Sequence, residues 1–531
     1  MIKALRALEL HELQDFTQEV KSEVLLRVKE KIPHLESSLA VAELTVALHY
    51  VLNTPEDVLI WDVGHQGYIH KALTGRVKSL DHQRTRGGIS GFLNREESPF
   101  DFFGAGHAST SISALAGVCM ADAIKKYKRH RIAVVGDGSF TGGQTFEALN
   151  HLGTIDTNAL VILNDNNGSI DQTIGVLHNH QNYQAYFKSL GWEYHLCEDG
   201  NDVTALVAKL QQALTLGGKR VIHVKTTRPD LSPPKSYKPG TTFQWWAAEE
   251  MSLILAAHPE LQILSPAMFA GSGFAPLREK YPQQFHDTGI NEPHTVTTAA
   301  GIAAAGGKAW VHIYSTFLQR AIDQVIHDIA LQELPVVFLV DRAGFVGSDG
   351  PTHHGVFDQG FLLDIPNVTV WNPMNGSELQ AMLRRASEIQ PELTGPLFIR
   401  YPKAKTGCDS SVDFMEYRIL KQAHSHTLLL SSGVLSTFAD VGAMDHIHVG
   451  QVKPLPTEVK RMLGRYQTIV VLEESIGVGG LSGTVAMEIA QTDLDLKLVI
   501  RKIDDVFTEH GSRQELLKET GLIPSEKNPS Y

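Results

Sequence analysis

The chain has 531 residues, of which 43% are hydrophobic and 20% are charged, a composition typical of a globular protein with several cores. Lysine and arginine number 47 against 59 acidic residues, and this net charge of −12 argues against general nucleic-acid binding, which needs clustered positive charge. No membrane span is expected, and three cysteines far apart in the sequence predict neither a disulfide framework nor a metal-ligand set. We therefore expect a multidomain protein of the cytoplasm.

Short apolar runs rich in β-branched residues alternate with helical patterns along most of the chain. Four such runs, at 132–135, 160–163, 336–340 and 469–472, end in polar residues, as buried parallel strands do. The segment 315–332 carries one apolar stripe at helical spacing. Repeated strand–helix units predict α/β domains with doubly wound, mostly parallel sheets, in which ligands bind beyond the carboxyl ends of the strands.

Two breaks in this pattern divide the chain. Residues 226–242 contain four prolines and no apolar periodicity, which is typical of an extended linker. A weaker polar break follows Pro402. We therefore predict three domains, at 1–228, 245–403 and 410–531, with a linker at 229–244 between the first two.

Polar residues follow two neighbouring predicted strands. Asp137 lies between Gly136 and Gly138 at the end of one strand, and Asn166 follows the next strand. Glycines let the backbone approach a phosphate closely, while the Asp137 carboxylate, the Asn166 amide and the carbonyl of Gly168 offer the oxygen ligands that Mg²⁺ prefers. A tight turn and an ordinary loop would use the same residues, but the pair of motifs at strand ends favours a Mg²⁺–diphosphate site.

Longer stretches around this pair resemble one known family. The sequences DVGHQGYIHKALTGR (62–76), GAGHASTSISALAG (104–117), YSTFLQRAIDQV (314–325) and DRAGFVGSDGPTHHGVFD (341–358) are similar to those of 1-deoxy-D-xylulose-5-phosphate synthases, which are members of the transketolase superfamily. The resemblance extends over most of the chain. It implies a transketolase-like fold, thiamine diphosphate and Mg²⁺ as cofactors, and a homodimer. It also implies condensation of pyruvate with glyceraldehyde 3-phosphate, with loss of CO₂, in the supply of isoprenoid and thiamine precursors.

The resemblance also implies cofactor contacts. Glu292 corresponds to the carboxyl group that activates the cofactor, and its alanine-rich context favours a raised pKa, although from the residues alone it could equally start the helix led by Pro293. Phe317 corresponds to an aromatic residue that stacks on the pyrimidine, while its apolar stripe also suits the core. The other implied cofactor-binding residues are His65, Gly106, His107, Ala108, Gly136, Gly138 and Ser139.

Catalytic and substrate-binding residues follow from the same motifs. Proton transfer to and from substrate oxygens needs groups such as imidazole, and the resemblance implies His34, His65, His353 and Asp349 for this task. A substrate phosphate needs fixed cations. The implied phosphate binders are Arg320 and Arg400, with the hydroxyl groups of Tyr314 and Ser37, although a single arginine is more often part of a surface ion pair.

The chain departs from the family in three places. A long segment that the family has after Asn179 is missing, the 226–242 linker lacks the usual glycine-rich run, and 431–456 lacks a crossover helix. These changes affect the segments that cover the active site in the family, and they leave the identity of the acceptor aldehyde open. A related thiamine-diphosphate ketolase or 2-oxoacid decarboxylase with another acceptor, and a non-catalytic binding paralogue, therefore stay open as alternatives.

Overall fold

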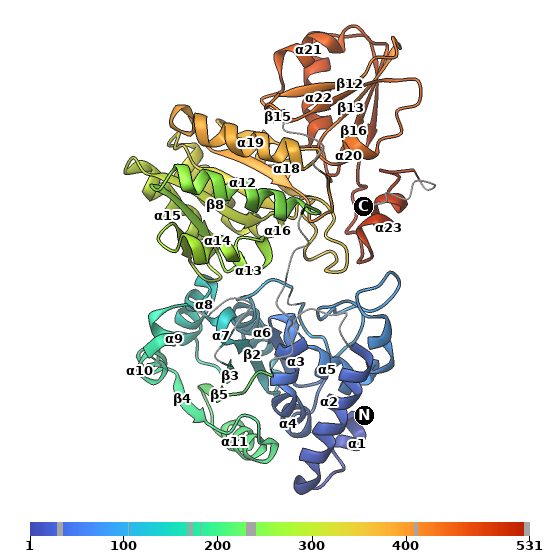
Figure 1. Ribbon diagram of the computed structural model, residues 1–531. Helices are drawn as coiled ribbons and strands as arrows, with labels where there is room; N and C mark the ends of the chain where they lie inside the picture. The colour runs from blue at the N-terminus through green and yellow to red at the C-terminus, as the bar shows by residue number, and fades with distance from the viewer. Residues whose placement is uncertain are drawn as a thin grey trace. The chain divides into compact units, whose positions relative to one another are not determined.

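The computed structural model describes residues 1–28, 35–104, 106–166, 168, 174–180, 182–229, 240–407 and 412–524. The chain forms two compact units, the first made of residues 1–234 and 289–291, and the second of residues 235–288 and 292–531 (Figure 1). The predicted catalytic residue His34 and most of the predicted linker lie outside the described residues. Among the described helices, none combines the length and apolarity needed to cross a membrane.

A parallel five-stranded sheet forms the centre of the first unit, with the strand order β1-β2-β3-β5-β4. Its strands, in chain order, are β1 (Val58–Asp62), β2 (Arg131–Gly136), β3 (Ala159–Asp165), β4 (Glu193–Cys197) and β5 (Lys219–Lys225). Successive residues of a strand point to opposite faces, so Leu59 and Trp61 enter one hydrophobic cluster and Val58 and Ile60 enter another. Cores on both faces confirm the predicted doubly wound arrangement.

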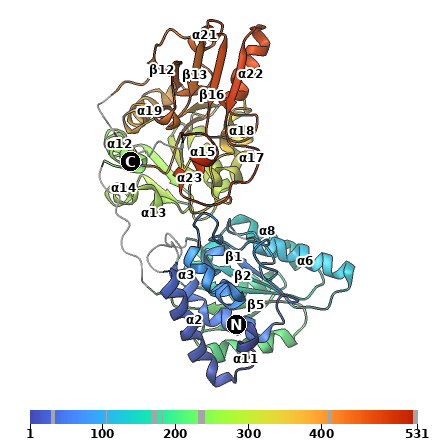
Figure 2. The same ribbon diagram turned by 90° about the vertical axis from the view of Figure 1, so that its right-hand side faces the viewer.

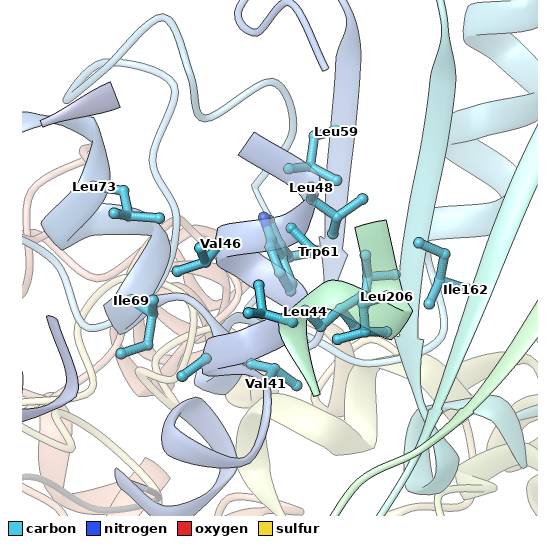
Figure 3. Close-up of a cluster of buried hydrophobic side chains, with 14 of the residues drawn as sticks. Val41, Leu44, Val46, Leu48, Leu59, Trp61, Ile69, Leu73, Ile162 and Leu206 are labelled. Carbon is cyan, nitrogen blue, oxygen red and sulfur yellow. The ribbon is translucent and has the colours of Figure 1, made fainter. Parts of the chain in front are cut away.

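Helices pack on both faces of this sheet (Figure 2). On one face, Trp61 packs among leucines of α4 (Ala42–Val51) and α11 (Val203–Thr215), as Figure 3 shows for Leu44, Leu48 and Leu206. The other face is covered by α6 (Ser111–Lys125) and α8 (Gly143–Gly153). Other described helices of this unit are α1 (Ile2–Leu5), α2 (Leu13–Val28), α3 (Leu35–Ala40), α5 (Tyr68–Lys71), α7 (Asp137–Phe140), α9 (Val176–His180) and α10 (Tyr183–Ser189).

The second unit contains a seven-stranded sheet with the order β15-β10-β11-β9-β8-β6-β7. Its strands are β6 (Leu261–Ser265), β7 (Phe285–Asp287), β8 (Lys308–Tyr314), β9 (Val337–Asp341), β10 (Thr369–Trp371), β11 (Leu397–Tyr401) and β15 (Gln451–Lys453). All neighbouring pairs are parallel except β10 and β15. Because β15 belongs to the region predicted as a third domain, that region contributes an edge strand to the sheet of the second.

Two helix layers complete this part of the second unit. α12 (Phe243–Ala257) and α19 (Gly376–Ile389) pack together on one face, and α15 (Glu292–Ala304) packs on the other with β8. The predicted helix over 315–332 is divided into shorter pieces that include α16 (Ser315–Leu318) and α17 (Ile322–Gln324). The remaining helices here are α13 (Phe269–Ser272), α14 (Ala275–Lys280) and α18 (Asp358–Leu362).

A third sheet lies in the C-terminal part of the second unit, with the order β12-β14-β13-β16-β17. Its strands are β12 (Tyr417–Lys421), β13 (Thr427–Ser431), β14 (Asp445–Val449), β16 (Thr468–Leu472) and β17 (Lys497–Arg501), and only the β12–β14 pair is antiparallel. In the fully described stretch between β13 and β14 the only helix is the four-residue α20 (Leu435–Phe438), which agrees with the predicted loss of a crossover helix. The other helices are α21 (Thr457–Leu463), α22 (Leu481–Thr492) and α23 (Arg513–Glu519).

Candidate active site

The Asp137 carboxylate lies at the carboxyl end of β2, where α7 begins. It is buried, and it accepts hydrogen bonds from the backbone N–H of Gly138 at 2.9 Å and of Gly168 at 3.0 Å. Asn166 follows β3, and its buried Oδ1 has no hydrogen-bond partner among the described residues. Buried polar atoms are normally paired, so the Asn166 amide oxygen and the Asp137 carboxylate, at the ends of adjoining strands, fit a cation site.

A histidine that the sequence analysis did not single out lies at the same place. Asp137, Asp165 and His178 offer ligand atoms that all lie within 4.8 Å of one another. Asp165 also contacts His223 Nε2 at 2.9 Å. Mg²⁺ prefers oxygen ligands, whereas an imidazole nitrogen suits transition metals, so the oxygens of Asp137 and Asn166 are the better match to Mg²⁺. His178 comes close only through folding, and no spacing in the sequence indicates it.

A buried polar network ties the GAGHAS motif to the residues after β2. The Asp62 carboxylate accepts hydrogen bonds from the backbone N–H of Ser109 at 2.9 Å and of Ser111 at 3.0 Å. Ser109 Oγ donates to the carbonyl of Ser139 at 2.7 Å. Burial raises the pKa of Asp62. The network ties Ser109, which directly follows the predicted cofactor residues Gly106, His107 and Ala108, to the predicted diphosphate residue Ser139.

His65 lies in the same unit, between β1 and α5. Its ring lies 5.2 Å from the ring of Phe92, and its carbonyl accepts a hydrogen bond of 2.5 Å from Ser38 Oγ. Ser38 belongs to α3, which also carries the predicted substrate residue Ser37. The fold therefore brings the start of α3 to the DVGHQ motif.

In the second unit, Glu292 is the first residue of α15 and its side chain is 2% exposed. Its Oε2 has no hydrogen-bond partner among the described residues, and Arg320 NH1 lies 3.7 Å from it. Burial raises the pKa of Glu292, and the Arg320 guanidinium partly opposes this rise. Glu292 is therefore compatible with both predictions. It is the first residue of the helix, and it is also a buried carboxyl group whose raised pKa favours the protonated form.

Aromatic rings gather near the end of β8. The rings of Tyr314 and Phe317 stack with centroids 6.0 Å apart, and the ring of His353 meets Phe317 edge-on at 5.5 Å. The Arg342 guanidinium lies 3.6 Å from the centroid of Tyr314, and it also donates to the carbonyl of Gly271 at 2.9 Å. Arg342 is a further cation that the sequence analysis did not single out, although it lies in the DRAG motif. Its stacking on Tyr314 depends on side-chain packing that no sequence spacing encodes.

Arg400 lies at the end of β11 and is held by acceptors of its own unit. Nε and NH2 donate to the Asp358 carboxylate at 2.8 and 2.7 Å, and NH1 donates to Asn372 Oδ1 at 3.3 Å. A guanidinium has five N–H groups, so two remain. Arg400 lines a small hollow. Other residues that line the hollow are Gly344, Gln359, Asn372, Ser432 and Glu474. Arg320 and Arg400 thus each have a carboxylate beside them, and Asp349 lies with His353 in the loop between β9 and α18.

Comparison with known proteins places the chain in a family. Residues 1–185 match the family model described as 1-deoxy-D-xylulose-5-phosphate synthase, and residues 242–407 match the model of the transketolase pyrimidine-binding domain. The 1-deoxy-D-xylulose-5-phosphate synthase of Thioalkalivibrio sulfidiphilus is 37% identical over 98% of this chain and 92% of its own length. The chain belongs to the 1-deoxy-D-xylulose-5-phosphate synthase family. Membership of this family implies thiamine diphosphate as cofactor.

Other members of the family are similar to this chain over nearly its whole length. The synthase of Chlorobium phaeovibrioides is 36% identical over 98% of this chain and 95% of its own length. The alignment with the first relative spans 595 residues, against 531 residues in this chain, so these relatives contain segments that this chain lacks. Among solved structures, the transketolase of Leishmania mexicana is 15% identical, covers 97% of this chain and 96% of its own, and has a TM-score of 0.47.

Proposed function

We propose that this protein condenses pyruvate with glyceraldehyde 3-phosphate and releases CO₂, giving 1-deoxy-D-xylulose 5-phosphate. The observation that carries the proposal is the environment of Glu292 in a member of this family. A buried carboxyl group with a raised pKa can share a proton with a ring nitrogen, which is the contact that thiamine-dependent carbon chemistry needs.

The first unit would hold the cofactor's charged end. Asp137 and Asn166, with the carbonyl of Gly168, would bind Mg²⁺, because they offer a carboxylate and an unpaired amide oxygen at adjoining strand ends. Ser139 and the Gly106–Ala108 turn would supply neutral polar contacts to the diphosphate. When bound, thiamine diphosphate supplies the carbon nucleophile and electron sink that decarboxylation of a 2-oxoacid requires.

The second unit would supply the proton and the stacking surface. Glu292 holds a proton at the carboxyl group because burial disfavours its ionised form. Phe317 would offer its half-buried ring face to the pyrimidine, with the ring of Tyr314 stacked against it. His353 and Asp349, with His65 and His34, would exchange protons with substrate oxygens, as imidazole and carboxylate groups do near neutral pH.

The acceptor phosphate would bind at the hollow lined by Arg400. Its two remaining N–H groups can donate to phosphate oxygens, and such charge-assisted hydrogen bonds contribute about 1.5–3 kcal/mol each. Tyr314, Ser37 and Arg320 would complete the substrate contacts. We also propose a homodimer, as the family resemblance implies.

A second candidate is a related synthase or decarboxylase that uses an acceptor without phosphate. The contacts of the two arginines favour this candidate. Arg320 lies 3.7 Å from Glu292, and three of the N–H groups of Arg400 already donate hydrogen bonds to Asp358 and Asn372. Fewer free donors would weaken the discrimination between phosphorylated and unphosphorylated aldehydes.

Product analysis distinguishes these candidates. The protein with thiamine diphosphate and Mg²⁺ is given pyruvate and a panel of aldehydes, and products are identified by mass spectrometry while CO₂ is counted. We expect 1-deoxy-D-xylulose 5-phosphate with one CO₂ per ketose. A different ketose would indicate the related synthase, CO₂ without ketose a decarboxylase, and bound cofactor without pyruvate consumption a binding paralogue.

A further inference from the structure

The loop between β9 and α18 carries Asp349 and His353, and its base is fixed by residues far along the chain. Glu474, which follows β16, accepts a hydrogen bond of 2.7 Å from the backbone N–H of Phe345. Arg513, at the start of α23, donates to the carbonyl of Phe345 at 2.8 Å and forms a two-pronged ion pair with Glu474. Both polar groups of one loop residue are thus held by a single charged pair.

Glycines of the loop allow this close approach. A Cβ on Gly344 would lie 2.4–2.6 Å from the Glu474 carboxyl atoms, and one on Gly347 would lie 3.2 Å from the carbonyl oxygen of Gly511. A Cβ on Gly350 would lie 3.0 Å from the Cβ of His510. All three glycines have positive φ, which other residues rarely adopt. The loop is therefore shaped around Glu474 and the segment 510–513.

The side chains behind the loop are apolar and buried. Phe345 and Val356, at its two ends, belong to a hydrophobic cluster with Leu516 and Leu517 of α23 and Leu472 of β16. The Val346 N–H donates to His354 Nδ1 at 3.2 Å. Packing and hydrogen bonds thus fix the base of the loop, while Asp349 and His353 lie further along it.

We propose that Glu474 and Arg513 are positioning residues for the reaction. They hold the loop 343–355 so that Asp349 and His353 keep the geometry needed for proton transfer, which rests on the proposed function for the roles of those two residues. Arg513 is not required to touch the cofactor or the substrate, whereas Glu474 also lines the hollow beside Arg400, so the Arg513 variants carry the test of positioning. The C-terminal region, despite its short crossover, thereby contributes to catalysis through the shape of one loop.

The variants Arg513→Gln, Arg513→Lys and Glu474→Gln test this inference. Lysine keeps the charge but lacks the planar two-pronged geometry, and glutamine in place of Glu474 keeps the acceptor for the Phe345 N–H. Arg461→Gln is a matched control, because Arg461 is 72% exposed and its nearest carboxylate, Glu458, lies 3.9 Å away in the same region. Thermal unfolding identifies any variant that fails to fold, and the remaining variants carry the test.

Two readouts separate positioning from general damage. Hydrogen–deuterium exchange should accelerate at least about tenfold in peptides covering 343–355 of Arg513→Gln, with other peptides unchanged. A displaced catalytic group commonly costs up to about 100-fold, so kcat should fall about ten- to hundredfold while thiamine diphosphate affinity stays within about twofold. The lysine variant should recover part of kcat, and Arg461→Gln should match wild type in both readouts.

The outcomes are distinct. Unchanged exchange at 343–355, or equal losses of kcat and cofactor affinity, would overturn the positioning role. If exchange is faster only at 343–355 in Arg513→Gln, but wild type makes no ketose from pyruvate and glyceraldehyde 3-phosphate, then Glu474 and Arg513 do hold the loop. In that case the proposed function is contradicted instead. If wild type forms 1-deoxy-D-xylulose 5-phosphate but exchange at 343–355 is unchanged in Arg513→Gln, the proposed function is supported and the positioning role is contradicted.

Discussion

Asp137 and Glu292 are both buried carboxyl groups at the first residue of a helix, yet their surroundings differ. Each of the two carboxylate oxygens of Asp137 accepts a hydrogen bond from a backbone N–H, at 2.9 and 3.0 Å. Glu292 Oε2 has no donor within hydrogen-bond distance among the described residues, and burial raises the pKa of Glu292. Both carboxyl groups are buried, so the difference between them lies in their partners: both oxygens of Asp137 have backbone donors, whereas Glu292 Oε2 has none among the described residues and burial dominates the pKa of Glu292.

The largest expected effect comes from removing the proton held at Glu292. Glu292→Gln keeps the size of the side chain but replaces the carboxyl group with an amide that has no acidic proton. Hydrogen exchange at C2 of bound thiamine diphosphate should slow by about 10²–10⁴, the range for loss of one acid–base contact, with cofactor affinity nearly unchanged. Exchange measured by nuclear magnetic resonance after acid quench checks this.

Glu250→Gln is the matched control for that experiment. Glu250 is also buried in the second unit, burial raises its pKa, and it pairs with Arg384 at 2.7 Å instead of with Arg320. Its replacement should leave C2 exchange at the wild-type rate. Wild-type exchange in Glu292→Gln, or equal slowing in both variants, would show that Glu292 has no special role.

The complementary variant is Asp137→Ala in the first unit. Loss of a charged ligand should raise the dissociation constant for thiamine diphosphate about ten- to hundredfold and increase the Mg²⁺ requirement. C2 exchange at saturating cofactor should stay near wild type, the reverse of Glu292→Gln. Titration by intrinsic fluorescence at several Mg²⁺ concentrations measures both constants. Unchanged cofactor affinity would remove Asp137 from the metal site.

These two groups also show how far the sequence could predict the site. The position of Asp137 and Asn166 at adjoining strand ends was predictable, because the ends of neighbouring parallel strands meet at one sheet edge. The helix start at Glu292 was predictable from Pro293. The four mostly parallel strands predicted from apolar runs are present for the same local reason, since their pattern lies within each segment.

Partner choice between distant side chains was not predictable in this way. Arg320 beside Glu292, the Arg400–Asp358 pair and Arg342 over Tyr314 each depend on how helices and loops pack after the sheets form. The addition of β15 to the second sheet likewise depends on an edge that no local pattern marks. The sequence motifs therefore predict which side chains belong to the site, whereas the partners of those side chains depend on tertiary packing.

A smaller effect is expected at the phosphate end of the site. Arg400→Met combined with Asp358→Asn removes both charges of the buried pair, so no unpaired charge is left inside. The KM for glyceraldehyde 3-phosphate should rise about tenfold, the loss expected for one charge-assisted hydrogen bond, while unphosphorylated glyceraldehyde is affected little. Steady-state kinetics with the two aldehydes measures the ratio. Equal losses would indicate general damage to the hollow.

The smallest expected effect concerns the cation beside Glu292. The Arg320 guanidinium opposes the rise in the pKa of Glu292, so Arg320→Gln should raise that pKa further. Well below pH 4.5, the ordinary value for glutamate, Glu292 is protonated in both the folded and the unfolded chain, so its ionisation does not separate variant from wild type. The two proteins diverge only as pH rises through the raised folded-state pKa of wild-type Glu292, because there the wild-type carboxyl group ionises while that of the variant stays protonated, and the thermal midpoint of the variant should fall relative to wild type.

The carboxyl infrared band of Glu292, identified by its loss in Glu292→Gln, gives a direct measurement of the same change. In Arg320→Gln the band should disappear at a higher pH than in wild type. Arg385→Gln is the control, because Arg385 and Glu388 form an exposed pair of the second unit at 3.3 Å. A band that disappears at the wild-type pH in Arg320→Gln would show that burial alone sets the protonation of Glu292. The contrast with Asp137 would then depend only on backbone donors, and the cation at 3.7 Å would serve the substrate instead.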